Sequence, residues 1–420
     1  MINVLIFPAG EVNSVELHDA LATCVNITVW GASSIDRHGG YVFENYISGV
    51  AMITAPDFFH KFNALLEDKK IDVVLPTHDT VAMFLADNED KIKAKIICSG
   101  RQTAKICRDK EKTYQALSGA DFLPKTYKEV TEFPVFIKPK EGQGGVGAKL
   151  VKTQQDIPTD LSDYVICEYL PGEEYTVDCL TDKNGNLRVV SPRSRQRLMA
   201  GVSVAGKTEE LTEEIQHIAD FINSKLSFLG LWWFQIKKDV HGKWKLMEVS
   251  VRGAGTMALT RARGINLPLL SVYTAMGYDI NVVSNPYQVQ MDSSLIRRYK
   301  IDYDYDTVYF DFDDTLIVRG KVNLKAVWFL YQCQNLGKKV VLLTKHEKEI
   351  LESMSHYHID RGLFSRIVHI NPEDNKAKYI QPNKAIFIDN AYQERQSVFS
   401  VHHIPVFDVD GLDVLMDWRI

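Results

Sequence analysis

The 420-residue sequence is poor in cysteine and contains no paired cysteine motif. Its six cysteines are scattered along the chain, and no two of them form a C-x-x-C pair: Cys24, Cys98, Cys107, Cys167, Cys179 and Cys333. In a long chain this pattern argues against a disulfide framework and against a cysteine-held metal. It favours reduced core cysteines in a cytoplasmic protein.

Long apolar runs and a basic leader are also missing. No stretch approaches the roughly 20 apolar residues that a bilayer span requires. The opening "MINVLIF" has neither a basic region nor a cleavage site, so we expect no secretory signal. These absences predict a cytoplasmic protein without a membrane partner.

The sequence has no excess of positive charge. Its formal net charge is -5 at pH 7, which gives no electrostatic reason to expect nucleic acid or an anionic membrane surface as a partner. A hydrophobic content of 45% with 25% charged residues is typical of a globular enzyme rather than a disordered chain. The length favours two or three domains.

Apolar runs alternate with amphipathic stretches, which predicts an α/β protein. In the first hundred residues, "NVLIFPAG", "NITVWGAS", "DVVLPTHD" and "AKIICSG" read as strands. We predict a Rossmann-like parallel sheet over residues 1–102, with ligand-binding loops at its strand ends. Gly10, Glu11, His78 and Asp79 follow such ends and are candidates to line a substrate pocket, although His78 also suits an ordinary hydrogen-bonded loop position.

The middle of the chain contains a glycine-rich stretch, "GQGGVG", at 142–147. A dinucleotide-binding motif requires a following helix, but "AKLVKT" alternates like a strand, and no G-K-[ST] follows as in a P-loop. A hairpin whose bare backbone amides close over a triphosphate fits better, with a purely structural hairpin as the alternative. The glycines concerned are Gly142, Gly144, Gly145 and Gly147.

Polar residues around this loop have the types that a nucleotide requires. Lys138 stands at a strand end just before the loop, where its charge reaches phosphate oxygens. Glu168 and Glu174 flank the short hinge Tyr169–Leu170. Their carboxylates can accept from adenine or ribose, and hinge backbone groups can read the adenine edge.

The paired strands "LWWFQIKKD" and "KWKLMEVSVRG" place Gln235 and Glu248 on neighbouring strands. Two facing oxygen ligands, completed by phosphates and water, are a usual way to hold Mg²⁺. Arg252, four residues after Glu248, is expected on the same strand face, where it can neutralise a transferred phosphate.

A basic stretch lies between these motifs. Arg193, Arg195 and Arg197 alternate and are expected to share one face of a strand, with Lys207 in a following loop. The alternative is a solvated edge strand. Their place between two nucleotide motifs favours substrate or acyl-phosphate binding.

This order of motifs resembles that of the ATP-grasp family, including members similar to carbamoyl phosphate synthetase. The resemblance begins at residue 103 and extends to about 290, and we place the domain at 103–298, after an N-terminal companion domain. It implies that Lys110 and Lys138 bind the triphosphate, Glu168, Tyr169 and Leu170 the adenine, and Glu174 the ribose. Gln235 and Glu248 would hold Mg²⁺, and Ser250 stands where the family commonly has an asparagine ligand.

The family chemistry implies how such a site would act. ATP phosphorylates a carboxylate, cations hold the acyl phosphate, and an amine displaces the phosphate. Catalysis then depends on positioning and charge neutralisation. The expected substrates are a small-molecule carboxylate and an amine.

A third segment opens with "VYFDFDDTLIVRG" at 308–320. Asp311 and Asp313 lie on the same side of an extended chain at the end of an apolar run. A nucleophilic carboxylate, a carboxylate that protonates the leaving oxygen and a Mg²⁺ ion would account for this crowding. The spacing does not fit a calcium loop, and an acidic turn remains the structural alternative.

Three later features favour phosphoryl transfer. Thr344 ends the buried run "KKVVLLT", Lys376 or Lys378 supplies a cation, and Asp389 ends "KAIFID". In a parallel sheet these tips converge on one crevice.

This set resembles the haloacid dehalogenase-like phosphatases over about 306–420, and we place the domain at 299–420. The resemblance implies that Asp311 is the nucleophile, Asp313 the general acid and base, and Thr344 and Lys376 the phosphoryl-binding residues. Asp311 and Asp313 would also bind Mg²⁺, and Asp389, with Asn390 or Glu394, would complete the metal site. One helix and one strand fit between Thr315 and Thr344, so we expect no cap domain.

The sequence thus predicts a ligase fused to a phosphatase that acts on a phosphorylated small molecule. A kinase or carbamoyl-phosphate-type synthase that releases a stable phosphorylated product is the first alternative. A regulator that binds nucleotide without turnover is the second, and Ser250 is its support. A homodimer is compatible with all three.

Overall fold

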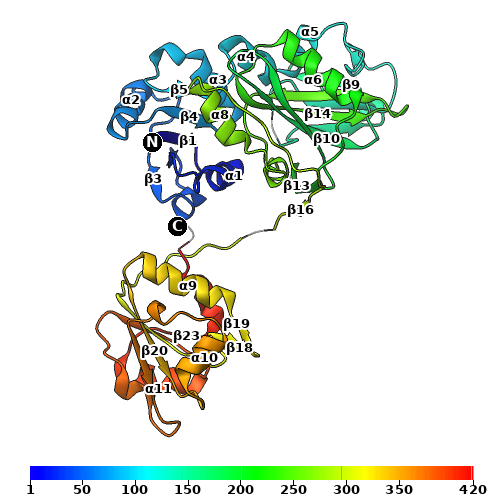
Figure 1. Ribbon diagram of the computed structural model, residues 1–420. Coiled ribbons are helices and arrows are strands. Elements are labelled where there is room, and N and C mark those ends of the chain that lie inside the picture. Colours follow the sequence, from blue (N-terminus) through cyan, green and yellow to red (C-terminus); the bar gives the residue numbers. More distant parts are fainter. Residues whose placement is uncertain (143, 200, 295, 418, 420) are drawn as a thin grey trace. The chain divides into compact units, whose positions relative to one another are not determined.

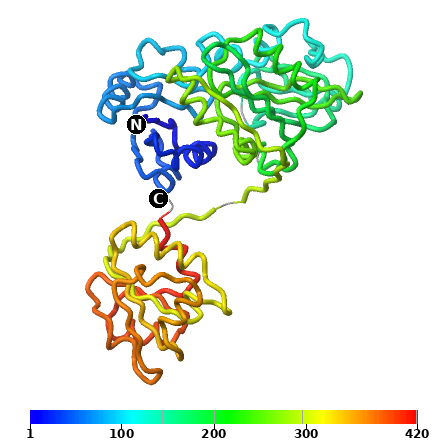
Figure 2. Tube along the Cα trace, viewed as in Figure 1, coloured from blue at the N-terminus to red at the C-terminus, as the bar shows by residue number. Residues whose placement is uncertain are grey.

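The structure, a computed structural model, describes residues 1–142, 144–199, 201–294, 296–417 and 419. The chain divides into two units, 1–295 and 296–420 (Figure 1). Figure 2 traces the chain through both units from the amino to the carboxyl end.

The first unit begins with a five-stranded parallel sheet of order β3-β2-β1-β4-β5. Its strands are β1 (Ile2–Phe7), β2 (Ile27–Ser33), β3 (Asn45–Ser48), β4 (Val73–Pro76) and β5 (Lys95–Ile96). The helices of this region are α1 (Val12–Leu21), α2 (Phe58–Asp68) and α3 (Asp79–Asp87). The four predicted strands all occur. β3 is additional, and its sequence "NYIS" is too short and polar to stand out as a strand.

Antiparallel sheets make up the rest of the first unit. A four-stranded sheet of order β6-β9-β7-β8 contains the glycine-rich hairpin. Its strands are β6 (Thr126–Tyr127), β7 (Val135–Pro139), β8 (Lys149–Val151) and β9 (Tyr164–Glu168). A second sheet has the order β11-β10-β14-β15 and a third the order β12-β13-β16.

The strands of the second sheet are β10 (Glu174–Thr181), β11 (Leu187–Ser194), β14 (Gly230–Lys238) and β15 (Trp244–Ser250). Those of the third are β12 (Arg197–Met199), β13 (Val202–Lys207) and β16 (Gln290–Asp292). The helices are α4 (Arg101–Arg108), α5 (Lys110–Ala116), α6 (Glu213–Lys225), α7 (Ala258–Ala262) and α8 (Leu267–Ala275). The apolar face of α6 is buried, and Thr212 caps its first turn.

One hydrophobic core serves both the parallel sheet and the antiparallel sheets. Leu5 and Phe62 belong to the same buried cluster as Val177 and Phe234. A second cluster likewise joins residues of the first hundred to residues beyond 180. The core therefore runs across the boundary that the sequence suggested between residues 102 and 103.

The second unit repeats the parallel arrangement with the order β21-β20-β17-β22-β23. Its strands are β17 (Thr307–Phe310), β20 (Lys339–Thr344), β21 (Arg366–His369), β22 (Ala385–Ile388) and β23 (Val406–Phe407), and its helices are α9 (Leu324–Asn335), α10 (Ile350–His356), α11 (Tyr392–His402) and α12 (Leu412–Leu415). A short hairpin, β18 (Ile317–Val318) and β19 (Lys321–Val322), precedes α9. Between Thr315 and Thr344 the chain thus holds only this hairpin, one helix and one strand.

Within the described ranges, no helix combines the length and the apolar character needed to cross a bilayer.

Candidate active sites

Gln235 and Glu248 lie directly opposite each other on the antiparallel strands β14 and β15. The register shifts immediately after Gln235, so the pair sits at a bulge. The Glu248 carboxylate is 3.6 Å from the ammonium of Lys110. The pairing of these two strands therefore brings together the two side chains that the sequence predicted as oxygen ligands of Mg²⁺.

Two buried lysines accompany this pair. Lys110 begins α5, where Asp109 caps the helix by accepting from two backbone amides. Lys138 in β7 donates to the Tyr114 hydroxyl at 2.7 Å and to the Met247 carbonyl at 2.8 Å. Burial lowers the pKa of Lys138. Lys110 is thus held close to β15 by its ion pair with Glu248, and Lys138 by its hydrogen bonds.

Glu174 connects the oxygen donors to further cations. Its carboxylate is 2.7 Å from Arg195 and 3.2 Å from Lys237, and it also accepts from the Gln235 amide. The residue that was predicted to bind ribose is therefore placed next to one predicted metal ligand.

The predicted adenine hinge follows β9. The Glu168 carboxylate accepts from the Lys125 backbone amide at 2.8 Å, which fixes the end of this strand. Tyr169 is partly buried and Leu170 is buried. Of the three residues that the sequence predicts to bind adenine, Glu168 therefore already has a backbone partner.

The glycine-rich stretch is the turn of the β7–β8 hairpin, and Gln143 within it lies outside the described residues. Gly144, Gly145 and Gly147 have φ of 63°, 71° and 77°, a conformation that favours glycine. The Gly142 carbonyl accepts from Arg108 at 3.0 Å. The tip of the β12–β13 hairpin approaches this loop so closely that a Cβ on Gly201 would overlap the Gly144 carbonyl.

Asp79, which the sequence suggested only as a candidate to line a substrate pocket, contacts two residues at and beyond the end of β15. It begins α3, accepts from the Ser250 hydroxyl at 2.8 Å and lies 2.8 Å from Arg252. Burial alone would raise the pKa of Asp79, but the Arg252 guanidinium beside it lowers that pKa below its ordinary value. Ser250 and Arg252 are therefore tied to the parallel sheet as well as to β15.

Arg252 itself lies beyond the end of β15, with its guanidinium 5.6 Å from the centre of the Trp233 ring. The expectation that it shares a strand face with Glu248 does not hold, because β15 ends at Ser250.

The three predicted substrate arginines do not share one strand face. β11 ends at Ser194 and β12 begins at Arg197, so Arg195 lies between two strands. Arg193 is 1% exposed and donates to both oxygens of the buried Asp178. The sequence could not show this pairing, because Asp178 is 15 residues earlier on the adjacent strand.

The last two of these four basic residues, Arg197 and Lys207, pair with other acids. Arg197 pairs with Asp292 on the exposed surface. Lys207 lies 3.4 Å from Glu209 and is 42% exposed. Only Arg195 of the four joins the Glu174 group.

The first unit provides donors and acceptors that fit a nucleotide with Mg²⁺. Arg108, Arg195 and Arg252 each bury a guanidinium Nε without a partner among the described residues, and a polyanion would satisfy such groups. No three His, Cys, Asp or Glu side chains cluster as a metal site in the described part of the chain. Gln235 and Glu248 instead offer two oxygens, which suits an ion that phosphates and water complete.

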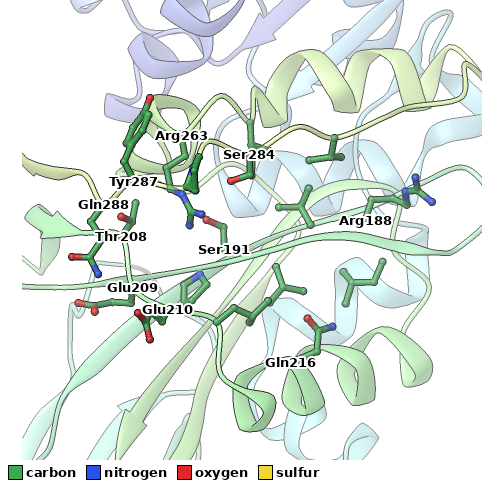
Figure 3. Close-up of a pocket in the computed structure, with 18 residues that line it drawn as sticks. Arg188, Ser191, Thr208, Glu209, Glu210, Gln216, Arg263, Ser284, Tyr287 and Gln288 are labelled. Carbon is green, nitrogen blue, oxygen red and sulfur yellow. The ribbon is translucent and has the colours of Figure 1, made fainter.

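A cavity of about 640 Å³ lies elsewhere in this unit, beside the edge strand β11 (Figure 3). Arg188, Ser191, Glu209 and Tyr287 are among its lining residues, and none of the predicted site residues lines it. Several lining groups are already engaged, for example the Tyr287 hydroxyl, which donates to the Ala262 carbonyl at 2.8 Å. We therefore locate the candidate site at Gln235, Glu248 and the lysines beside them rather than at this cavity.

In the second unit Lys376 joins two predicted acids. Its ammonium is 2.6 Å from Asp311 and 2.6 Å from Asp389, which follow the adjacent parallel strands β17 and β22. Burial raises the pKa of Asp311 to about 7, and burial also raises the pKa of Asp389. Lys378, the alternative in the sequence, is 70% exposed and faces Asp374.

Thr344 ends β20 with its hydroxyl buried and without a partner among the described residues. A hydroxyl in this state needs an acceptor, and a phosphoryl oxygen would supply one. Thr315 lies within 3.5 Å of Asp311 and accepts from the Asn390 backbone amide at 3.1 Å. The strand tips thus converge as the parallel topology predicted.

The remaining acids are held by partners that the sequence did not reveal. Asp313 lies 2.9 Å from the Nδ1 of His346, and the adjacent Asp314 has φ of 51°. Glu394 is 2.6 Å from the ammonium of Lys345. Both partners follow Thr344 directly, so the segment after β20 contacts two acids of this group.

Comparisons with known proteins include one family-model match, which lies in the first unit. Residues 160–295 match the model of a family described as ATP-grasp in the biosynthetic pathway with Ter operon. The 3-methyl-D-ornithine–L-lysine ligase of Methanosarcina barkeri is 24% identical over 157 residues. That match covers 35% of this chain and 40% of the ligase, so the chain spans well under half of the length of this relative.

Two solved structures each match 67% of the length of this chain. Rhizobium etli pyruvate carboxylase has a TM-score of 0.55 at 15% identity, and the match covers 29% of its length. The biotin carboxylase domain of Hydrogenobacter thermophilus 2-oxoglutarate carboxylase, solved with MgADP and bicarbonate, has a TM-score of 0.55 at 15% identity over 71% of its length. Together these matches support the ATP-grasp family and a mixed α/β fold of that kind.

Proposed function

We propose that the first unit is an ATP- and Mg²⁺-dependent ligase that activates a small-molecule carboxylate as an acyl phosphate for attack by an amine. We propose further that the second unit is a Mg²⁺-dependent phosphomonoesterase. The observation that carries the first proposal is the facing pair Gln235 and Glu248 beside Lys110. The observation that carries the second is Lys376 between Asp311 and Asp389.

In the ligase, charge neutralisation is the main task of the protein. Lys110 and Lys138 would bind the triphosphate, and the glycine-rich hairpin would cover it with backbone amides. Glu168, Tyr169 and Leu170 would line the adenine. Glu174 would meet the ribose while it holds Arg195.

Bound Mg²⁺, held by Gln235 and Glu248, would neutralise phosphate charge. Ser250 is a weaker candidate ligand, since its hydroxyl already donates to Asp79. Arg252, whose buried Nε has no partner among the described residues, would stabilise the acyl phosphate.

Ligase chemistry agrees with the names of similar proteins. The Methanosarcina relative is a ligase that joins two amino acids, as its name states. The Hydrogenobacter carboxylase domain was solved with MgADP. This likeness and the residues above support the proposal of a carboxylate and an amine as substrates, with ATP and Mg²⁺.

In the phosphatase, Asp311 would attack phosphorus while Thr344 and Lys376 hold the phosphoryl oxygens. Asp313 would protonate the leaving oxygen and later take a proton from the attacking water. Asp389 and Asp311 would hold Mg²⁺, with Asn390 as a further neighbour. The lack of an inserted cap leaves this site open to a phosphorylated small molecule of substantial size.

Two substitutions in the full chain test the proposal. Glu248→Ala should lower substrate-dependent ADP release about 100-fold or more and leave p-nitrophenyl phosphate hydrolysis unchanged. Asp311→Asn should do the reverse. A panel of carboxylates and amines, with ADP release as the signal, finds the substrates.

The product distinguishes a ligase from a kinase or a carbamoyl-phosphate-type synthase. A ligase releases inorganic phosphate, which phosphorus NMR detects, whereas the alternatives release a stable phosphorylated product. Loss of both activities in both folded variants would contradict two independent sites. Tight ATP binding without ADP formation across the panel would favour a regulator.

A further inference from the structure

His346 contacts the carboxylate that the phosphatase proposal treats as the general acid. Its Nδ1 is 2.9 Å from one Asp313 oxygen and 3.0 Å from the other. The Asp313 side chain is 53% exposed, whereas that of His346 is 13% exposed. A half-exposed carboxylate is therefore held by a side chain that is mostly buried.

His346 is fixed from several sides. Its Nε2 is 2.6 Å from the Ser353 hydroxyl of α10, and its ring meets the Phe312 ring edge-on at 5.0 Å. The His346 carbonyl lies 2.6 Å from His369 Nε2. Helix α10 and strand β21 thus set the position of the imidazole before any substrate arrives.

The partners of the two ring nitrogens define one tautomer. A carboxylate only accepts, so Nδ1 must carry the hydrogen that Asp313 receives. Nε2 then has a lone pair, which accepts from the Ser353 hydroxyl. The neutral imidazole satisfies both contacts, and it satisfies them equally when one Asp313 oxygen carries a proton and the other accepts.

We propose that His346 is a positioning residue that orients Asp313 for proton transfer, an inference that rests on the proposed phosphatase function. As the Asp311 oxygen bonds to phosphorus, the bond from phosphorus to the leaving oxygen breaks, and the Asp313 proton passes to that oxygen. Water then attacks phosphorus, the aspartyl bond breaks, and Asp313 takes the proton of the water. His346 keeps its own proton throughout and holds the carboxyl group in line.

The experiment compares two aryl phosphates on the full chain with Mg²⁺. The p-nitrophenolate group leaves with little help from an acid, whereas phenolate is more basic and needs protonation. His346→Ala should lower kcat/KM, which reports the step in which the leaving group departs, about tenfold or more for phenyl phosphate and at most about twofold for p-nitrophenyl phosphate. Asp313→Asn should show the same difference more strongly.

Two variants complete the design. His346→Asn keeps an N–H near the position of Nδ1 and should restore part of the phenyl phosphate activity. His356→Ala removes an exposed histidine from the same helix as Ser353 and should behave as wild type. A structural role for His346 would lower both substrates together.

The outcomes separate this inference from the function on which it rests. If the wild type is active and Asp311→Asn is not, equal losses on both substrates in His346→Ala, or no loss at all, overturn the positioning role. If the wild type hydrolyses neither substrate, the phosphatase proposal fails and this inference fails with it.

A second measurement requires no activity. Nitrogen-15 NMR of histidine-labelled protein reports which ring nitrogen carries hydrogen, and His346→Asn identifies the signal by its loss. The inference predicts hydrogen on Nδ1 of His346. Hydrogen on Nε2 alone would overturn it, since Nδ1 could not then donate to Asp313.

Discussion

At the scale of single residues, the acid cluster of the second unit depends on Lys376. Its side chain is 3% exposed and binds Asp311 and Asp389 at 2.6 Å each. One ammonium between two carboxylates leaves a net negative charge in a buried place. Mg²⁺ would compensate this charge. Without the ion, a proton bound to one of the two carboxylates would neutralise it instead.

Without metal, the second unit should lose stability as the pH rises from about 4 to about 7. Burial raises the pKa of Asp311 from 3.8 to about 7, and Lys376 opposes this only in part. The folded state therefore binds more protons than the unfolded state in this interval, so the free energy of unfolding falls with rising pH. Hydrogen exchange of β17 and β22 in chelator-treated protein, corrected for the intrinsic pH dependence of exchange, measures the slope.

Asp311→Asn should flatten this slope because asparagine does not titrate. Asp302→Asn replaces an exposed acid of the same unit and should leave it unchanged. An unaltered slope in Asp311→Asn would contradict the assignment of the proton to this residue.

At the scale of elements, the β12–β13 hairpin packs closely against the glycine-rich hairpin. Gly201 has φ of 77°, and a Cβ there would overlap the Gly144 carbonyl. Gly201→Ala should displace the glycine-rich loop and weaken ADP binding by roughly tenfold, which is about 1.4 kcal/mol. Titration calorimetry with MgADP measures this.

Gly242→Ala is the matched control for this element. Gly242 also has φ of 77°, in the turn between β14 and β15, but a Cβ there would meet nothing within 4 Å. Both variants carry the same backbone strain, so equal effects on ADP binding would contradict a loop contact.

Element-scale patterns in the sequence predicted a large part of this arrangement. Alternation within β14 and β15 placed Gln235 opposite Glu248, because strand pairing fixes which side chains face each other. The apolar runs before Asp311 and Asp389 predicted parallel strands whose tips converge on one crevice. These predictions depend on periodicity, which is a local property of the chain.

The remaining features depend on contacts between distant parts of the chain. Asp79 meets Ser250 across 171 residues, and His346 meets Asp313 across 33. Arg193 has the same local pattern as Arg195, yet its burial beside Asp178 follows from the twist and packing of the sheet. No periodicity in the sequence distinguishes a buried arginine from one that lines a site.

At the scale of the whole molecule, the two units have separate hydrophobic cores. Each buried cluster of the described residues falls either within 2–282 or within 305–416. Apolar burial is the main stabilising contribution in each unit. The stabilities of the two units should therefore be largely independent.

Phe329→Ala should lower the free energy of unfolding of the second unit by about 3–5 kcal/mol, because Phe329 is fully buried in its core. Differential scanning calorimetry of the full chain should show two transitions, of which this variant moves one. Phe234→Ala, in the core of the first unit, should move the other. A single transition that both variants shift would contradict separate cores.

The shared core of the first unit bears on how such a chain can be recombined. A crossover between residues 296 and 304 leaves every buried cluster complete. A crossover near residue 102 separates Leu5 and Phe62 from Val177 and Phe234, so each half would need a new apolar partner surface. The second unit can therefore be exchanged as a whole between recombined chains, while the parallel and antiparallel sheets of the first unit have to be kept together.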